Sequence, residues 1–338
     1  MKSRTMTLAA VVFLAVLAVM LIAAAEAPAA KKIQVATVAL PETTIYQGLE
    51  KWKKVLEERS KGSLTVHILG RAVMGGDREM IEGCRLGTLE TAVVSGSVIA
   101  NIQPEFFMVA MPYLFNDHPE ANAFLDGAIG QKLFKLVEAK GLVGLGWATW
   151  SFRGVWNNVR PVTDPEALKG LKIRTVETPL DMSIMNSMGG VATPMAWSEC
   201  LLGLKQGTVD GISTTYGLGY ALKLYELAKF ASRTNHYYES APLIMSKQVF
   251  DGLTPEERKL VKETAAEAMR WSRMEQGKLD DGIKEQLEAK GVKVNYISKE
   301  AFEAFRGKTK PLYEQFRGKI GAEFMDEALK VLETSRKK

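Results

Sequence analysis

Short apolar runs alternate with helix-forming segments along most of this 338-residue chain, and this alternation restricts its fold more than any other feature. Valine, isoleucine and leucine gather in the short runs, whereas apolar residues recur at helical spacing in the longer segments. The first half predicts strands over 33–39, 64–69, 91–95 and 141–153, with helices over 44–60 and 77–86. Such alternation is typical of α/β proteins.

The second half continues the alternation and adds one helix of unusual length. It predicts strands over 172–175, 209–213 and 241–246, and helices over 179–188 and 196–206. The segment from Pro255 to Ala289 then reads as a single helix, longer than most helices of globular domains. The chain length fits two modest lobes better than one large core. We therefore predict that the long helix lies along both lobes.

The first residues have the composition of an export signal. Lys2 and Arg4 precede an apolar run over 6–25, and small residues follow it. The run is also long enough for an uncleaved membrane anchor, but its Ala-rich end and the polar start at Lys31 favour cleavage. We expect a periplasmic protein with a signal peptide over 1–29, lobe I over 30–152 and 240–280, and lobe II with the C-terminal helices over 153–239 and 281–338.

The segment between Arg153 and Thr214 contains the residues that a carboxylate site needs. Within it, Gly170-Leu171-Lys172-Ile173-Arg174 predicts a short strand that ends in an arginine. A planar guanidinium donates two parallel charge-assisted hydrogen bonds to a carboxylate and stays ionised when it is desolvated. Open α/β sheets bind ligands at the ends of their strands. Arg174 is therefore a candidate ligand residue, and a structural salt bridge at the surface is the alternative.

Several motifs along nearly the whole chain resemble the solute-binding subunits of tripartite ATP-independent periplasmic (TRAP) transporters, the DctP-like family. Besides the strand at Arg174, they are Leu86-Gly87-Thr88-Leu89-Glu90-Thr91-Ala92, Pro104-Glu105-Phe106, Met111-Pro112-Tyr113-Leu114-Phe115, Thr234-Asn235-His236 and Thr254-Pro255-Glu256-Glu257. The resemblance implies a two-lobed periplasmic binding protein fold, type II-like, with a long helix spanning both lobes. It also implies a receptor that delivers a small carboxylate solute to integral-membrane TRAP permease subunits.

The resemblance assigns solute contacts to particular side chains. Arg174 matches the family's arginine that clamps the solute carboxylate. Arg153 matches a second arginine, and its apolar neighbours mean that it needs a carboxylate partner from the protein or from the ligand. Trp197 stands where the family packs an aromatic residue over the solute, although a core tryptophan would look the same. Thr214 replaces an asparagine that binds the ligand in many members, and this puts a C4-dicarboxylate solute in doubt.

Weaker candidates come from lobe I and from the crossing between the lobes. Ser95 and Gly96 lie at a strand-to-helix junction, where free N–H groups suit an anion. Ser95 serves equally well as a simple helix cap. Tyr237 lies in the predicted interlobe crossing beside His236, which we expect to be a structural histidine.

Motifs for catalysis, metal binding and nucleic-acid binding are missing from the sequence. The three histidines are widely spaced, and neither a nucleophile elbow nor a Walker lysine loop is present. The net charge of +5 is mild, and Lys and Glu alternate along the C-terminal helices, so nucleic acid is not an expected partner. Cys84 and Cys200 lie among apolar residues, and we expect two buried free thiols.

We therefore predict a monomeric transport receptor without a cofactor, without a metal and without catalytic residues. A periplasmic sensor for a signalling system is the alternative, and a secreted enzyme is less favoured. The solute classes that remain open are C4-dicarboxylates, 2-oxo acids, aromatic acids and sugar acids.

Overall fold

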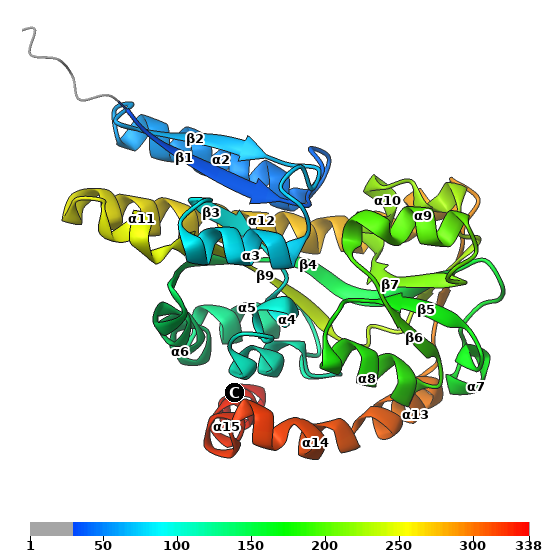
Figure 1. Cartoon of the computed structure of the whole chain (residues 1–338). Coiled ribbons are helices and arrows are strands. Elements are labelled where there is room, and N and C mark those ends of the chain that lie inside the picture. Colours follow the sequence, from blue (N-terminus) through cyan, green and yellow to red (C-terminus); the bar gives the residue numbers. More distant parts are fainter. Residues whose placement is uncertain (1–29, 338) are drawn as a thin grey trace, which may run out of the picture.

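A computed structural model describes residues 30–337, so the predicted export signal over 1–29 lies outside the described part of the chain. One mixed sheet, with strand order β2-β1-β3-β9-β4-β7-β5-β6, extends through two lobes (Figure 1). The strands are β1 (Lys31–Thr37), β2 (Leu64–Leu69), β3 (Thr91–Val93), β4 (Leu142–Asn157), β5 (Lys172–Thr175), β6 (Val191–Pro194), β7 (Gly211–Thr215), β8 (Phe230–Arg233), β9 (Tyr238–Ser246) and β10 (Lys293–Tyr296).

Helices flank the sheet in both lobes (Figure 1). Those of lobe I are α2 (Thr44–Arg59), α3 (Asp77–Leu86), α4 (Gly96–Ile99), α5 (His118–Asp126), α6 (Ala128–Val137) and α11 (Lys247–Asp251), with the 3-10 turns η1 (Pro104–Ala110) and η2 (Glu138–Lys140). Those of lobe II are α7 (Pro165–Leu168), α8 (Pro179–Met188), α9 (Cys200–Lys205) and α10 (Tyr216–Ala221), with η3 (Trp197–Glu199) and η4 (Leu224–Glu226). The predicted α/β alternation is confirmed.

Strand β4 belongs to both lobes. Its first half pairs antiparallel with β9, and its second half pairs with β7 and β8. The register shifts between Thr149 and Ser151, and Ser151 has a φ of 87°, which is rare for a residue other than glycine. The chain thus crosses between the lobes in one strand, which ends at Asn157 and not at the predicted residue 153.

The segment predicted as a helix over 196–206 is helical over 197–205, but it is not one regular α-helix. The chain forms the 3-10 turn η3 and then α9, which has six residues. The tertiary contacts of this segment explain the difference, because the carbonyl of Met195 and the ring of Trp197 both contact Arg174. Strand β6 was not predicted, since it is a short, partly exposed segment that ends in a proline and pairs only with β5.

Helix α12 (Pro255–Glu288) lies along both lobes, as predicted. A capping box formed by Thr254 and Glu257 starts the helix. The helix contacts α2 and β4 in lobe I, and α10 and β10 at the other end. The buried side chain of Arg273 donates to Trp147 O at 2.5 Å, which fixes the helix to the crossing strand.

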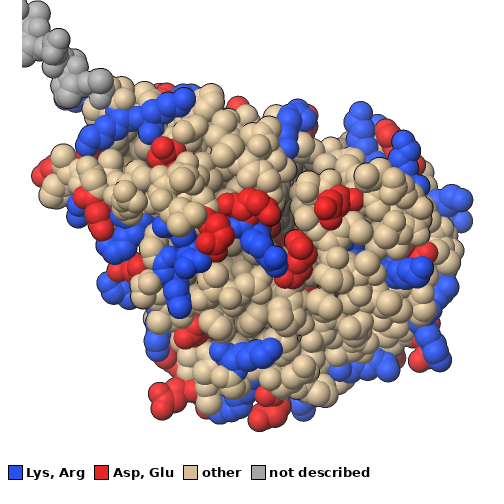
Figure 2. Space-filling model, in the orientation of Figure 1, with Lys and Arg blue, Asp and Glu red and all other residues tan. Residues whose placement is uncertain are grey.

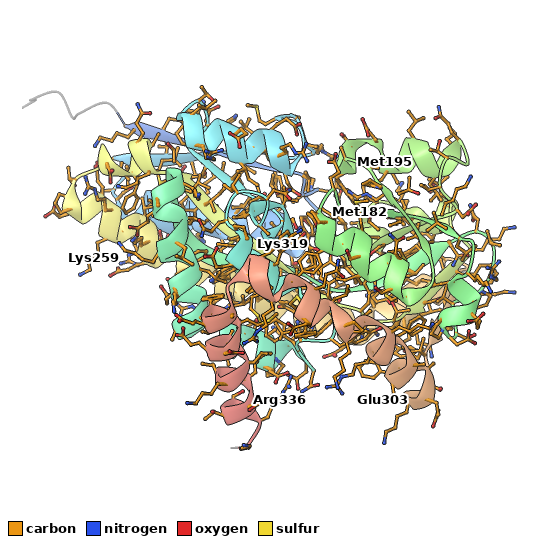
Figure 3. The ribbon with its side chains drawn as sticks, turned by 60° about the horizontal axis from the view of Figure 1, so that its bottom comes forward. Met182, Met195, Lys259, Glu303, Lys319 and Arg336 are labelled. Carbon is orange, nitrogen blue, oxygen red and sulfur yellow. The ribbon has the colours of Figure 1, made fainter. Side chains whose placement is uncertain are left out.

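Three C-terminal helices run across one face of the molecule (Figure 3): α13 (Lys299–Thr309), α14 (Pro311–Ile320) and α15 (Ala322–Arg336). Helix α13 contacts α7 and α8 of lobe II, whereas α15 contacts α5 and η1 of lobe I. The hydroxyl of Tyr313 in α14 donates to Pro112 O at 2.9 Å. These helices therefore touch both lobes, and the division of the chain at residue 280 stays a prediction.

Both cysteines are buried and free, as predicted. Cys84 belongs to the large core centred on lobe I, and Cys200 belongs to a smaller core around Trp156 and Ile212 in lobe II. Within residues 30–337, no helix is both long enough and apolar enough to span a membrane.

Candidate functional site

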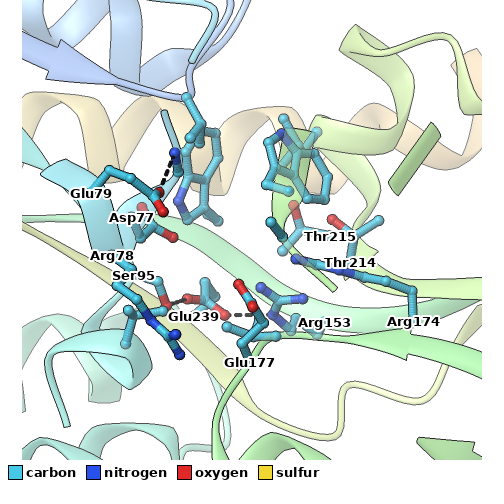
Figure 4. Close-up of a pocket in the computed structure, with 18 residues that line it drawn as sticks. Asp77, Arg78, Glu79, Ser95, Arg153, Arg174, Glu177, Thr214, Thr215 and Glu239 are labelled. Carbon is cyan, nitrogen blue, oxygen red and sulfur yellow. Dashed lines mark hydrogen bonds and ion pairs between the residues drawn. The ribbon is translucent and has the colours of Figure 1, made fainter. Parts of the chain in front are cut away.

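A cavity of ≈ 630 Å³, open solvent at its mouth included, lies between the two lobes. The space-filling view shows a narrow opening with acidic and basic side chains gathered around it (Figure 2). Lobe I contributes the end of β1, the start of α3 and the β3–α4 region. Lobe II contributes β5, β7, η3 and α10, and the crossing strands β4 and β9 also line the cavity. Lining side chains labelled in Figure 4 are Asp77, Arg78, Glu79, Ser95, Arg153, Arg174, Glu177, Thr214, Thr215 and Glu239.

Arg174 lies on β5 with its guanidinium group at the cavity. The residue is 3% exposed, and its Nε and Nη2 atoms donate to Met195 O at 2.9 and 2.7 Å. The ring of Trp197 lies 5.2 Å from the centre of the guanidinium. Nη1 is buried and has no hydrogen-bond partner among the described residues. A buried donor without an acceptor is costly, so this arginine is suited to receive an anionic oxygen in the cavity.

Arg153 lies on β4 and is held by the protein itself. Its Nε donates to Glu239 Oε2 at 2.5 Å, and its Nη1 donates to Ser213 O at 2.5 Å. The ring of Tyr237 lies 5.3 Å from the guanidinium centre. The buried charge therefore has a carboxylate partner from the protein, which is one of the two alternatives that the sequence left open.

Asp77 begins helix α3 and faces the arginines across the cavity (Figure 4). Burial raises the pKa of its carboxyl group to about 7, and the negative charge of Glu239 adds to this effect. A hydrogen bond from the Ser95 backbone and the charges of Arg174 and Arg153 oppose the rise. Near neutral pH this group therefore exists partly as a neutral acid, which can donate a hydrogen bond as well as accept one.

Comparison with known proteins identifies the family. The model of the bacterial extracellular solute-binding proteins, family 7 (DctP), matches residues 35–319. This chain belongs to that family. The 2,3-diketo-L-gulonate-binding periplasmic protein YiaO of Escherichia coli (strain K12) is 33% identical to this family 7 chain over 70% of this chain and 73% of that protein.

Solved structures of family 7 relatives share the fold. The sugar acid binding protein DctPAm of Advenella mimigardefordensis, in complex with galactonate, has a TM-score of 0.87 at 27% identity and covers 90% of this chain and 98% of that chain. A TRAP periplasmic solute-binding protein of Polaromonas sp. JS666, bound to D-erythronate, has a TM-score of 0.85 at 31% identity. The match covers 88% of this chain and 98% of that chain. The two-lobed TRAP receptor fold is thus confirmed, and the chain is a solute receptor and not an enzyme.

The structure brings five of the seven predicted site residues to the cavity of this family 7 receptor: Arg174, Arg153, Trp197, Thr214 and Ser95. Gly96 and Tyr237 do not line it. A side chain on Gly96 would overlap the Ser240 hydroxyl, so this glycine permits close packing. The Tyr237 hydroxyl donates to Asp181 behind the cavity lining.

The lining residues that the sequence did not predict include Asp77, Trp150, Thr215 and Glu239. Glu239 is 1% exposed and accepts hydrogen bonds from Arg153 and from the Ser95 hydroxyl. Its only sequence signal is that it is a single acid at the start of an apolar strand. Asp77 was indistinguishable from an ordinary first-turn helix acid. Thr215 is buried, and its hydroxyl has no partner within residues 30–337.

His236 is a structural residue, as predicted. Its Nε2 lies 3.0 Å from the Ser213 hydroxyl, and its Nδ1 lies 2.8 Å from the Thr234 hydroxyl. Burial and the charge of Arg153 lower its pKa to about 3, so the ring stays neutral. Residues 30–337 also contain no group of three His, Cys, Asp or Glu side chains that could hold a metal ion.

Proposed function

We propose that this protein is the periplasmic receptor of a TRAP transporter, and that it binds a small organic-acid anion through Arg174. The observation that carries the proposal is that Arg174 lines the cavity and that its buried Nη1 atom lacks an acceptor among the described residues. A solute carboxylate would supply that acceptor in a charge-assisted hydrogen bond. Trp197 would cover the adjacent carbon skeleton of the solute.

The remaining lining favours a solute with several hydroxyl groups. Ser95, Thr214 and Thr215 present hydroxyls, and Asp77 presents carboxyl oxygens that accept hydrogen bonds. Three of the relatives described above bind 2,3-diketo-L-gulonate, galactonate and D-erythronate. Each is a hydroxylated acid, which agrees with this lining. We therefore infer a solute of the sugar-acid class.

Solute binding would drive closure of the lobes. Asp77 and Ser95 reach the cavity from lobe I, whereas Arg174 and Trp197 reach it from lobe II. A solute contacts both sets only when the lobes are shut, and this difference in contacts shifts the equilibrium toward the closed form. In the TRAP system, the closed receptor would then dock on the integral-membrane permease subunits.

A thermal-shift screen of the protein without residues 1–29 tests this function. The panel contains sugar acids, C4-dicarboxylates, 2-oxo acids and aromatic acids, each paired with its amide. We expect sugar acids to raise the melting temperature by mass action, and their amides to have no effect. An amide that stabilises the protein as well as its acid does would contradict the role given to Arg174.

The affinity for the acid should fall as the pH rises through about 7. A bound anion favours the neutral form of Asp77. Solute binding therefore takes up a proton at any pH at which Asp77 of the free receptor is ionised. Above this pH, the ionised Asp77 repels the solute, and we expect about a tenfold loss of affinity between pH 6 and pH 8.5. Calorimetric titrations measure this slope, and Asp77→Asn should abolish it. An equal slope in the variant would assign the pH dependence to another group.

A further inference from the structure

Glu239 occupies the position from which a second solute carboxylate would contact Arg153. It lies at the start of β9, lines the cavity, and is almost fully buried. One of its oxygens accepts from the Ser95 hydroxyl, and the other accepts from Arg153 Nε at 2.5 Å. The contact with Arg153 is thus the kind of contact that an anionic ligand makes with an arginine.

This pairing leaves little of Arg153 available to a solute. Of the three guanidinium nitrogens, Nε is bonded to Glu239 and Nη1 is bonded to Ser213 O. Separating a buried ion pair is costly, because each partner would then leave the other as a buried, uncompensated charge. Arg153 is therefore neutralised in the free receptor, and Arg174 is the buried cavity arginine whose charge has no carboxylate partner among the described residues.

The buried charges of the cavity add up to a site for one negative charge. Arg153 and Arg174 contribute two positive charges, and Glu239 contributes one negative charge. Asp77 is only partly ionised near neutral pH, because burial raises its pKa to about 7. The neighbouring Asp181 accepts a hydrogen bond from Tyr237 and does not line the cavity. At most one positive charge therefore remains, and one solute carboxylate balances it.

We propose that Glu239 acts as an internal substitute for a second solute carboxylate, and that it restricts this receptor to monocarboxylate solutes. The proposal rests on the function proposed above and names the specificity determinant of the same site. A dicarboxylate of suitable length would place its second anionic group near Glu239 and Asp77. Like charges at a desolvated interface are strongly unfavourable, so aldarates and C4-dicarboxylates are rejected.

Glu239→Gln tests the proposal because glutamine has almost the same shape and retains an oxygen for the Ser95 hydroxyl, but carries no charge. The probes are matched pairs that differ only in the oxidation of one terminal carbon: D-galactonate with galactarate, D-gluconate with D-glucarate, and D-erythronate with meso-tartrate. In the wild-type protein we expect titration to give tighter binding of the monocarboxylate of a pair. In Glu239→Gln, the dissociation constant of the dicarboxylate should fall by about tenfold or more, with that of the monocarboxylate nearly unchanged.

Two further variants make the result specific. Glu166→Gln removes an exposed acid that does not line the cavity, and it should leave the wild-type preference intact. The double variant Arg153→Gln/Glu239→Gln removes both charges of the pair. It should bind the dicarboxylates no better than the wild type, because the gain in Glu239→Gln comes from the freed guanidinium. In the single variant Glu239→Gln, the buried charge of Arg153 has no carboxylate partner and can impair folding. The double variant lacks this uncompensated charge.

A readout that needs no knowledge of the solute separates this proposal from the proposed function. Succinate at millimolar concentration should raise the melting temperature of Glu239→Gln more than that of the wild type, whichever acid is the natural solute. Equal shifts in the two proteins, or a wild type that binds both members of a pair equally well, would overturn the role of Glu239. Failure of every monocarboxylate to bind, combined with the succinate difference, would instead overturn the sugar-acid assignment and leave Glu239 as the determinant.

Discussion

Replacement of Arg174 by alanine is expected to weaken binding of the acid solute by about 2–5 kcal/mol. This is about a 30-fold or larger increase in the dissociation constant. The reason is that the solute carboxylate would stay buried in the cleft without the guanidinium that neutralises it. The cation–π contact with Trp197 would be lost as well. Calorimetric titration with the acid found in the solute screen measures the change.

Two controls separate ligand contact from structural damage. Arg174 also donates two hydrogen bonds to Met195 O, so alanine could release the segment that carries Trp197. Arg174→Lys keeps the charge but loses the planar fork, and its affinity should lie between those of the wild type and of alanine. Arg160→Ala removes an arginine that bonds Ala167 O and Lys169 O away from the cavity. It should leave the affinity unchanged, and an equal loss in it would place the effect outside the site.

Local signals explain where the sequence predicted the fold correctly. The bounds of α3 and α8 agree with the prediction. Both helices end at a glycine in the left-handed region, Gly87 with φ 74° and Gly189 with φ 110°. Thr178 caps the start of α8 by accepting from Asp181 N. Where the capping residues and the hydrophobic period indicate the same bounds, these local signals suffice to define the helix without tertiary contacts.

Arg174 was predictable for a similar reason. The short strand that carries this arginine has the predicted bounds, and β5 places the arginine where an open sheet binds its ligands. The segment after Pro194 was predicted as one regular helix. It begins instead with the 3-10 turn η3, because contacts with Arg174 that no local pattern encodes set its backbone.

The electrostatic balance of the cavity could not be read from the sequence. Arg153 was predicted at the site, but its partner Glu239 lies 86 residues further along the chain. Which of the chain's carboxylates neutralises a buried arginine depends on the packing of β4 against β9. The raised pKa of Asp77 likewise depends on burial between two lobes that the sequence does not position. Residue types at a site are thus easier to predict than their charge states.

Gly154→Ala is expected to destabilise the protein by about 3 kcal/mol or more. A Cβ atom at this position of β4 would overlap the phenol end of Tyr216 and lie 2.6 Å from Ser232 O. Tyr216 cannot move freely, since its hydroxyl donates to Ser232 O at 2.8 Å and its ring stacks on Arg233. Overpacking costs typically about 1–3 kcal/mol, and the lost buried hydrogen bond adds about 1–3 kcal/mol. Thermal or urea unfolding measures the loss, which corresponds to a melting temperature lower by roughly 6–12 °C.

Gly282→Ala is the matched control for the strand variant. Gly282 lies within helix α12, and a Cβ atom there would meet no other group within 4 Å. Alanine should therefore stabilise the protein by about 0.5–1 kcal/mol, because glycine loses more conformational freedom in a helix. The glycine-to-alanine substitution is thus expected to lower the stability at Gly154 and to raise it at Gly282.

Because Gly154 pairs with Thr214 of the cavity wall and adjoins Arg153, its alanine variant should also lose solute affinity. A variant with unchanged stability and affinity would show that β4 can move away from Tyr216 at no cost.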